Sequence, residues 1–268
     1  MADARPLYSG VSDRHAPPDA EAPRGITFQP DIYPRVLSLL PPPGTARILD
    51  VGAGEGYFTR LMRERGDDVT ACDYLEASFK VPEVPFHRAD LNEAIPLPDG
   101  SFDCVVAIEV IEHIENHTRF VRELMRVVRP GGTVIITTPN VLSIPSRWHF
   151  FWYGFNDCAP LPLDPHRADY WMQHINPISL PEILFLVERF GGELAGLHTN
   201  RIRKSARLPM AVLYPLLVLA LRGKLLRRKF AGVRALHERH IRWMLDRANL
   251  MGRITIAVAR RTAPLPPG

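Results

Sequence analysis

Short apolar runs alternate with longer helix-like segments along most of the chain. The first four runs are rich in Val, Ile, Cys or Ala and are bounded by Gly, Pro or Asp, as buried strands are. This alternation is typical of a parallel sheet covered by helices. The runs predict strands at 47–51, 68–72, 84–88, 103–108 and 133–138.

Two of the helix-like segments carry clear end signals. In the segment 117–132 the apolar residues fall on one helical face, and the pattern stops at Pro130. A second helix is predicted to begin at Ser179, which stands in capping-box spacing with Glu182, and to end at Gly191. Both segments are expected to cover the sheet.

Two further strands are predicted at 193–199 and 252–260. The roughly fifty residues between them are too many for a simple hairpin and indicate an inserted helical element, placed at 202–250. The expected fold class is therefore α/β, with a doubly wound, mostly parallel seven-stranded sheet and a helical insertion before the last strand.

Length and composition fit one large domain. The chain has 268 residues, 46% of them hydrophobic, which is enough to bury a substantial core. Residues 1–25 lack an apolar stretch and carry acids among prolines, which favours a disordered tail over a secretory signal. We expect a single folded domain at 26–268.

Cysteine usage and net charge exclude some classes. The three cysteines share no close spacing, so neither a disulfide framework nor a zinc site is indicated, and a cytoplasmic location is expected. The net charge of +4 does not by itself imply a nucleic-acid partner.

A glycine turn follows the first predicted strand, in the stretch RILDVGAGEGYFTRLM. Glycines at a strand-to-helix turn let a ligand approach the backbone, and the following helix offers unpaired N–H groups. Gly52 and Gly54 fit the dinucleotide fingerprint G-x-G-x-x-G, but the position of its third glycine is Tyr57. The turn is therefore expected to hold a different nucleotide-type cofactor.

Acidic residues around this turn indicate the charge of the ligand. Asp50 precedes the turn and Glu55 lies within it, where a pyrophosphate would be poorly placed. S-adenosylmethionine carries a sulfonium and an ammonium, and its ribose needs an acidic partner at the end of the next strand. Asp73 stands at that position.

Four segments in order resemble the class I S-adenosylmethionine-dependent methyltransferases. ILDVGAGEG resembles their first cofactor motif, and Asp73 their ribose-binding acid. RADLNEAIPLPDGSFDCVVAIEVIEHI resembles the adenine-side and fourth-strand motifs, and LMRVVRPGGTVIITTPN the fifth-strand segment. The resemblance covers about 45–140 and implies a Rossmann-like fold that transfers a methyl group.

At the methionine end of the cofactor, the resemblance implies contacts from the first motif. Asp50, Gly52 and Gly54 match its positions, and Ala53 and Tyr57 are expected to line the same pocket.

At the nucleoside end, the resemblance implies that Asp73 binds the ribose hydroxyls with Tyr74 beside the adenine. Asp90 is expected to contact the adenine amino group, helped by the backbone at Leu91. Glu109 ends the fourth strand and is expected near the sulfonium. Ligands of open α/β sheets lie outside the carboxyl ends of strands, where these residues stand.

Methyl transfer to a hydroxyl would be helped by a general base, and histidines titrate near the working pH. His174 is the first candidate and His113 the second, with Glu109 beside the reacting sulfur. Each histidine also has a structural interpretation, His174 as a packed or capping residue and His113 as a residue at a helix start.

The stretch EVIEHI resembles an E-x-x-E-H element that holds a divalent metal in some small-RNA 2'-O-methyltransferases and ubiquinone-pathway O-methyltransferases. Glu109, Glu112 and His113 would supply the ligands. The same letters occur in methyltransferases without a metal, and the further histidines of the RNA enzymes are not clearly matched. We expect no metal.

An aromatic-rich segment at 142–178 is expected to lie on the acceptor side. Aromatic walls suit sugars, arenes, lipids and nucleobases alike, and core packing is the alternative. The segment includes eight aromatic residues, namely Trp148, Phe150, Phe151, Trp152, Tyr153, Phe155, Tyr170 and Trp171.

The segment 201–234 places an apolar run, 208–221, between two basic clusters. The run is too short and too interrupted by proline to span a bilayer. Three interpretations stay open: a buried helix pair packed on the domain or on another subunit, a membrane-surface helix, and an RNA-binding element.

The sequence thus predicts a cytoplasmic methyltransferase, in one interpretation peripheral to the membrane, that uses S-adenosylmethionine and methylates a hydroxyl of a small or lipid-linked acceptor. The alternatives are an RNA 2'-O-methyltransferase with a divalent metal, an N-methyltransferase, and a non-catalytic cofactor-binding scaffold. A homo-oligomer stays open, and no nucleic-acid partner is expected.

Overall fold

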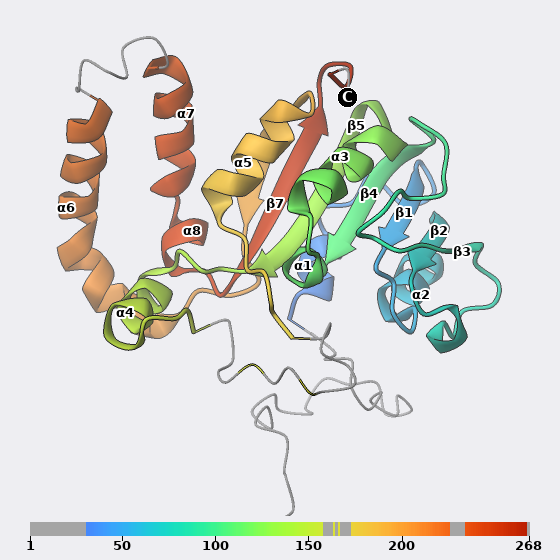
Figure 1. Ribbon diagram of the computed structural model, residues 1–268, viewed down its shortest axis with the longest axis horizontal. Helices are drawn as coiled ribbons and strands as arrows, with labels where there is room; N and C mark the ends of the chain where they lie inside the picture. Colours follow the sequence, from blue (N-terminus) through green and yellow to red (C-terminus); the bar gives the residue numbers. More distant parts are fainter. Residues whose placement is uncertain (1–30, 158–162, 164–165, 167–172, 226–233, 267–268) are drawn as a thin grey trace, which may run out of the picture.

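The computed structural model describes residues 31–157, 163, 166, 173–225 and 234–266. Within these residues seven strands form one sheet in the order β3-β2-β1-β4-β5-β7-β6 (Figure 1). Strands β1 to β5 are parallel, whereas β7 runs antiparallel to both β5 and β6. The strands are β1 Arg47–Val51, β2 Asp68–Asp73, β3 Phe86–Arg88, β4 Phe102–Ile108, β5 Val128–Pro139, β6 Gly192–His198 and β7 Ile254–Arg261.

Helices cover both faces of the sheet, which confirms the predicted fold class. Helices α1 (Tyr33–Leu37) and α2 (Tyr57–Glu64) pack on one face, and α3 (His117–Val127) and α5 (Leu180–Arg189) on the other (Figure 1). Alternate residues of each strand point to opposite faces. Ile48 of β1 accordingly joins the α1–α2 core cluster, while its neighbour Leu49 joins the α3–α5 cluster.

The predicted helix ends are correct for α5 and late for α3. The capping box of Ser179 and Glu182 is formed, and Gly191 has φ +75°. Helix α3 ends at Val127, before the predicted stop at Pro130, because Val128 already pairs with Phe102 as the first residue of β5. Strand pairing therefore overrides the helical pattern at this end.

Strand β3 is shorter than predicted. The apolar pattern predicts a strand at 84–88, but β3 spans Phe86–Arg88. Pro85 has no N–H to donate to a ladder, and only its carbonyl contributes, accepting a hydrogen bond from the Ala71 N–H at 2.9 Å. The other predicted strands are all present, with ends shifted by a few residues.

The predicted helical insertion lies between β6 and β7. It contains α6 (Arg207–Leu225), α7 (Arg234–Met244) and α8 (Arg247–Met251), and Figure 1 shows α6 and α7 side by side as the outermost helices. Helix α4 (Ile144–Tyr153) follows β5. Short 3-10 turns lie at Glu76–Ser78, Ile111–His113 and Lys204–Ala206, and the predicted tail 1–25 lies outside the described residues.

Candidate functional site

The site is built at the carboxyl edge of the parallel strands. Asp50 lies near the end of β1, Asp73 ends β2, and Glu109 directly follows β4. Because these strands are neighbours and parallel, their acidic residues meet at the same edge. The structure therefore gathers the three acids that the sequence assigns to the cofactor.

The turn after β1 requires glycine. Gly52, Gly54 and Gly56 have φ of +74°, +55° and +85°, a region that other residues rarely adopt. A Cβ atom at Gly52 would also overlap the side chain of Val110. The Gly54 N–H donates to Asp73 Oδ2 at 2.8 Å, so the turn is tied to the end of β2.

Asp50 is buried at the base of this turn. Thr59 Oγ1 donates a hydrogen bond to Asp50 Oδ2 at 2.6 Å. Burial raises the pKa of Asp50 to about 7, the Thr59 hydrogen bond opposes that rise, and the charge of Asp73 adds to it. A buried carboxylate so placed favours a positively charged ligand.

Asp73 keeps acceptor capacity for a ligand. Its Oδ1 accepts the Leu75 N–H at 3.1 Å and its Oδ2 accepts the Gly54 N–H. Each carboxylate oxygen has a further lone pair, which suits two ribose hydroxyls. Tyr74 beside it is 52% exposed, and the Arg88 guanidinium lies 5.3 Å from its ring centroid.

Asp90 and Leu91 lie next to this nucleoside side. The Ala89 N–H donates to the Asp73 carbonyl at 2.9 Å, which ties the loop to the end of β2. Asp90 Oδ1 accepts the Asn92 N–H at 2.9 Å, and Leu91 is buried in the core. One oxygen of the Asp90 carboxylate therefore accepts a hydrogen bond from the backbone of its own loop.

Glu109 has an unusual backbone. Its φ of +53° is the single positive value among the described non-glycine residues. Such strain persists where surrounding structure imposes it, often at functional sites. The Glu109 N–H donates to Thr137 Oγ1 at 3.0 Å, and that hydroxyl donates to Glu109 Oε1 at 2.8 Å. Burial raises the pKa of Glu109 to about 7, opposed by Thr137 and by Arg253.

A second acid, Glu112, is completely buried beside two histidines. Neither of its carboxylate oxygens has a hydrogen-bond partner within the described part of the chain. His174 Nε2 lies 4.0 Å from Glu112 Oε1, and the rings of His113 and His174 meet edge to face at 5.0 Å. Burial, then the charge of Glu109, raises the pKa of Glu112 well above its usual value.

These three side chains fit a divalent cation. The candidate ligand atoms of Glu112, His113 and His174 all lie within 4.8 Å of one another. A carboxylate with two imidazoles is a common donor set for divalent metals, and the two orphaned oxygens of Glu112 would gain a partner. The sequence pointed to Glu109, Glu112 and His113, whereas the structure groups His174 with the last two.

Tyr33 is a site residue that the sequence analysis missed. Its ring stacks on Tyr57 at 5.6 Å and on Phe58 at 5.3 Å. Burial, and then the charge of Asp50, raises its pKa. Tyr33 belongs to a short helix before β1, so only the folded chain brings it to the glycine turn. Tyr57, expected to line the cofactor pocket, contacts Tyr33 here.

The aromatic residues of α4 are not core residues. Trp148, Phe150, Phe151, Trp152 and Tyr153 are all more than half exposed. Core packing, the alternative interpretation of this segment, is therefore wrong for α4. Phe155 contacts the His149 ring at 4.9 Å, and Tyr170 and Trp171 lie outside the described residues.

With this fold and site, the chain is similar to the S-adenosylmethionine-dependent methyltransferases and has the fold of their solved structures, which supports S-adenosylmethionine as its cofactor. The matching family is the methyltransferase domain, over residues 49–136. A solved S-adenosylmethionine-dependent methyltransferase from Archaeoglobus fulgidus has a TM-score of 0.54 and 18% identity, covering 85% of this chain and 92% of that one.

Two curated relatives match about half of the chain. The "Probable S-adenosylmethionine-dependent methyltransferase" of Mycolicibacterium smegmatis is 34% identical over 142 residues, 51% of this chain and 49% of that protein. The ubiquinone biosynthesis O-methyltransferase of Alkalilimnicola ehrlichii is 32% identical over 143 residues, 50% of this chain and 56% of that protein. The chain thus spans about half the length of the curated relatives it matches.

Proposed function

We propose that this protein transfers the methyl group of S-adenosylmethionine to a hydroxyl oxygen of a small or lipid-linked acceptor. The observation that carries the proposal is the cluster of Glu112, His113 and His174 beside the acidic, glycine-lined edge that suits the cofactor. The relative named a ubiquinone biosynthesis O-methyltransferase supports oxygen as the acceptor atom. The exposed aromatic rings of α4 suit a lipid or other apolar acceptor.

The reaction is an in-line displacement at the methyl carbon. A lone pair of the acceptor oxygen forms the new C–O bond while the S–CH3 bond breaks. The electron pair of the broken bond stays on sulfur, which leaves S-adenosylhomocysteine with a neutral sulfur. The acceptor proton must leave, and an imidazole of His174 or His113 can take it. His113 Nδ1 lies 3.1 Å from the Gln173 carbonyl oxygen, which orients its ring.

Glu112 supports this proton transfer electrostatically. When ionised, its buried carboxylate would stabilise an imidazolium on His174, whose Nε2 is 4.0 Å away. The remaining task of the chain is alignment, which the glycine turn and Asp73 provide by fixing both ends of the cofactor.

In an alternative to the imidazole base, Glu112, His113 and His174 would hold a divalent cation, and their ligating nitrogens would then not accept the proton. A bound cation lowers the pKa of an acceptor hydroxyl near it. Calorimetric titration with MnCl2 tests this directly: the wild type should bind one ion, and Glu112→Gln should bind at least tenfold more weakly. Asp90→Asn, at another part of the edge, is the control, and equal binding by all three proteins would remove the cation site.

An RNA 2'-O-methyltransferase is the second candidate, since the same cluster is the feature that would favour it. Tritium transfer from labelled S-adenosylmethionine into separate lipid, sugar and RNA fractions of a cell extract distinguishes the candidates. The proposal expects label in a lipid or small-molecule fraction. Label in RNA alone, or none in any fraction although the cofactor binds, would contradict it.

A further inference from the structure

Helix α6 exposes apolar side chains over most of its length. No charged residue occurs from Leu208 to Leu221, yet Leu219 is 72% exposed and Leu216 is 58% exposed. Only some residues of the helix are half-buried, and α6 packs against α7, α8 and the preceding turn. Large exposed apolar patches on a protein surface mark interaction sites, so this helix needs a partner.

The aromatic helix α4 meets α6 at its base. Ile144 of α4 shares a small buried cluster with Met210 and Leu217 of α6, together with Leu250 and Met251. Figure 1 shows α4 at the foot of α6. We call the exposed apolar residues of the two helices the apolar face. Its members are Trp148, Phe150, Phe151, Trp152, Tyr153, Val212, Leu213, Leu216 and Leu219.

The segment that carries α6 is strongly basic. Residues 201–234 contain ten Lys and Arg and no Asp or Glu, although the whole chain has a net charge of only +4. The rest of the chain is therefore net negative. Along the sequence, positive charge is concentrated in the segment that carries the exposed apolar residues of α6.

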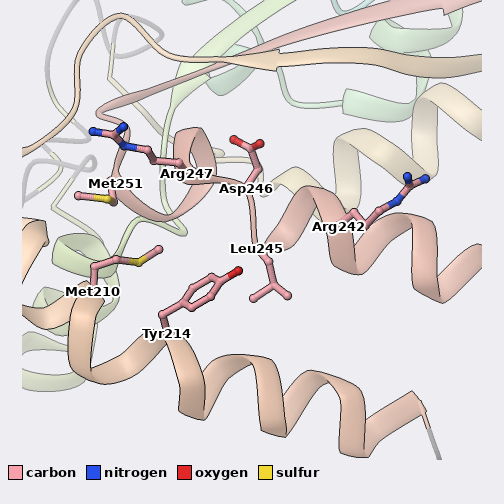
Figure 2. Close-up of a pocket in the computed structure, with 7 residues that line it drawn as sticks. All are labelled: Met210, Tyr214, Arg242, Leu245, Asp246, Arg247 and Met251. Atoms are coloured by element: carbon pink, nitrogen blue, oxygen red, sulfur yellow. The ribbon is translucent and has the colours of Figure 1, made fainter.

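Arginines also line the groove between α6 and α7. A cavity of about 650 Å³ lies between α6, α7 and α8, with Asp246 also in its lining, and Figure 2 shows Tyr214 of α6 pointing toward Leu245 across it. A second cavity, of about 680 Å³, is lined by Arg222 of α6 and by Arg234, Arg239 and Arg242 of α7, along with other residues. Basic side chains thus lie immediately beside the apolar helix.

We propose that the apolar face binds the surface of an anionic phospholipid bilayer. Exposed apolar and aromatic residues flanked by Lys and Arg are the features of interfacial helices, in which Trp and Tyr sit at headgroup level and basic residues attract anionic lipids. None of the described helices is long and apolar enough to cross a membrane.

Charge favours the bilayer over the other occupants. In a two-fold dimer the same patch would face itself, so the basic segment of one chain would meet that of the other. A nucleic acid would match the charge, but its phosphates would leave the leucines of α6 in contact with water. An anionic bilayer satisfies both properties at once.

The experiment is co-sedimentation of the full chain with vesicles of phosphatidylcholine and phosphatidylglycerol at three parts to one, compared with phosphatidylcholine alone. We expect at least tenfold stronger partitioning into the anionic vesicles, falling as salt is raised. Leu219→Glu and Phe151→Glu should each weaken partitioning roughly tenfold, since each removes an inserted apolar side chain and adds a repelled charge.

The matched control is Phe185→Glu on α5, where the apolar residue is 62% exposed but lies outside the apolar face. Calorimetric binding of S-adenosylmethionine shows that each variant is folded. Equal partitioning of the Leu219 and Phe185 variants, or self-association without vesicle binding, would overturn the proposal. The measurement needs no methyl transfer, so its outcome is independent of the proposed reaction.

Discussion

The carboxyl edge of the parallel strands, with Asp50, Asp73 and Glu109, is here called the cofactor edge. It differs from the α4–α6 region in which side chains are buried and in how firmly they are held. At the cofactor edge, buried acids and glycines are fixed by neighbouring parallel strands, and Asp73 alone bonds to two backbone N–H groups. In the α4–α6 region, apolar side chains face outward and few contacts fix them. The hydrogen bonds of the first region hold its polar groups in place without a ligand. The exposed apolar side chains of the second region are available to bind a partner.

The largest expected effect lies in the histidine cluster. His174→Ala should lower kcat roughly 10²- to 10⁴-fold, the range for loss of a general base. Binding of S-adenosylmethionine should change little, because His174 lies against Glu112 and His113. Single-turnover methyl transfer and calorimetry measure the two quantities. A kcat within twofold of wild type would remove His174 from the reaction.

A smaller loss is expected at the cofactor edge. Asp73→Ala removes the acceptors of two backbone hydrogen bonds and of the ribose, and it should weaken S-adenosylmethionine binding roughly 10- to 100-fold, since bonds to a charged group contribute about 1.5–3 kcal/mol. Glu238→Ala, at the exposed ion pair with Arg234 on α7, is the control. Unchanged affinity in the Asp73 variant would contradict the assignment of this edge to the cofactor.

Proton linkage is expected to change cofactor affinity about tenfold between pH 6 and pH 7.5. The cofactor's positive charges favour ionised Asp50 and Glu109, whose pKa values are raised to about 7, so binding should release protons and strengthen as pH rises. Titrations in buffers of different ionisation enthalpy count the protons. Proton uptake at pH 6 would contradict this.

The same two acids predict the pH dependence of stability without ligand. Between about pH 4 and pH 7 the folded chain holds protons that the unfolded chain has released, so the free energy of unfolding falls as pH rises through that window and levels off above it. Urea unfolding at several pH values tests this. The trend should be weaker in Asp50→Asn.

The smallest effect is expected in the α4–α6 region. Leu219→Glu should change the free energy of unfolding by no more than about 0.5 kcal/mol, because the side chain is 72% exposed. Thermal unfolding of the variant and of wild type gives the comparison. A loss of several kcal/mol would show that α6 is a structural helix of the domain.

Much of the cofactor edge could be predicted because its signals are local. A glycine turn, an acid at a strand end and an apolar run each lie within a few residues, and the fold then brings Asp50, Asp73 and Glu109 to one edge. The end of α3 could not be read in this way, since the pairing of Val128 with Phe102 decides it.

The missed features depend on distant contacts. Glu112 and His174 are far apart in sequence, and nothing local shows that they face each other. Tyr33 likewise reaches the glycine turn only through the packing of α1 on α2. For 201–234, periodicity could not distinguish a buried helix pair from an exposed one, since α6 is apolar on every side.

The antiparallel direction of β7 decides where the helical insertion leaves the sheet. Because β6 ends and β7 begins at the same edge, the helical insertion leaves the sheet at the edge where the parallel strands end. The base of the insertion is closed by a bridge between Ile202 and Gly252 and by the Arg203 N–H donating to the Met251 carbonyl at 2.8 Å. The helical insertion thus joins the sheet at closed junctions, apart from the strands that carry Asp50, Asp73 and Glu109.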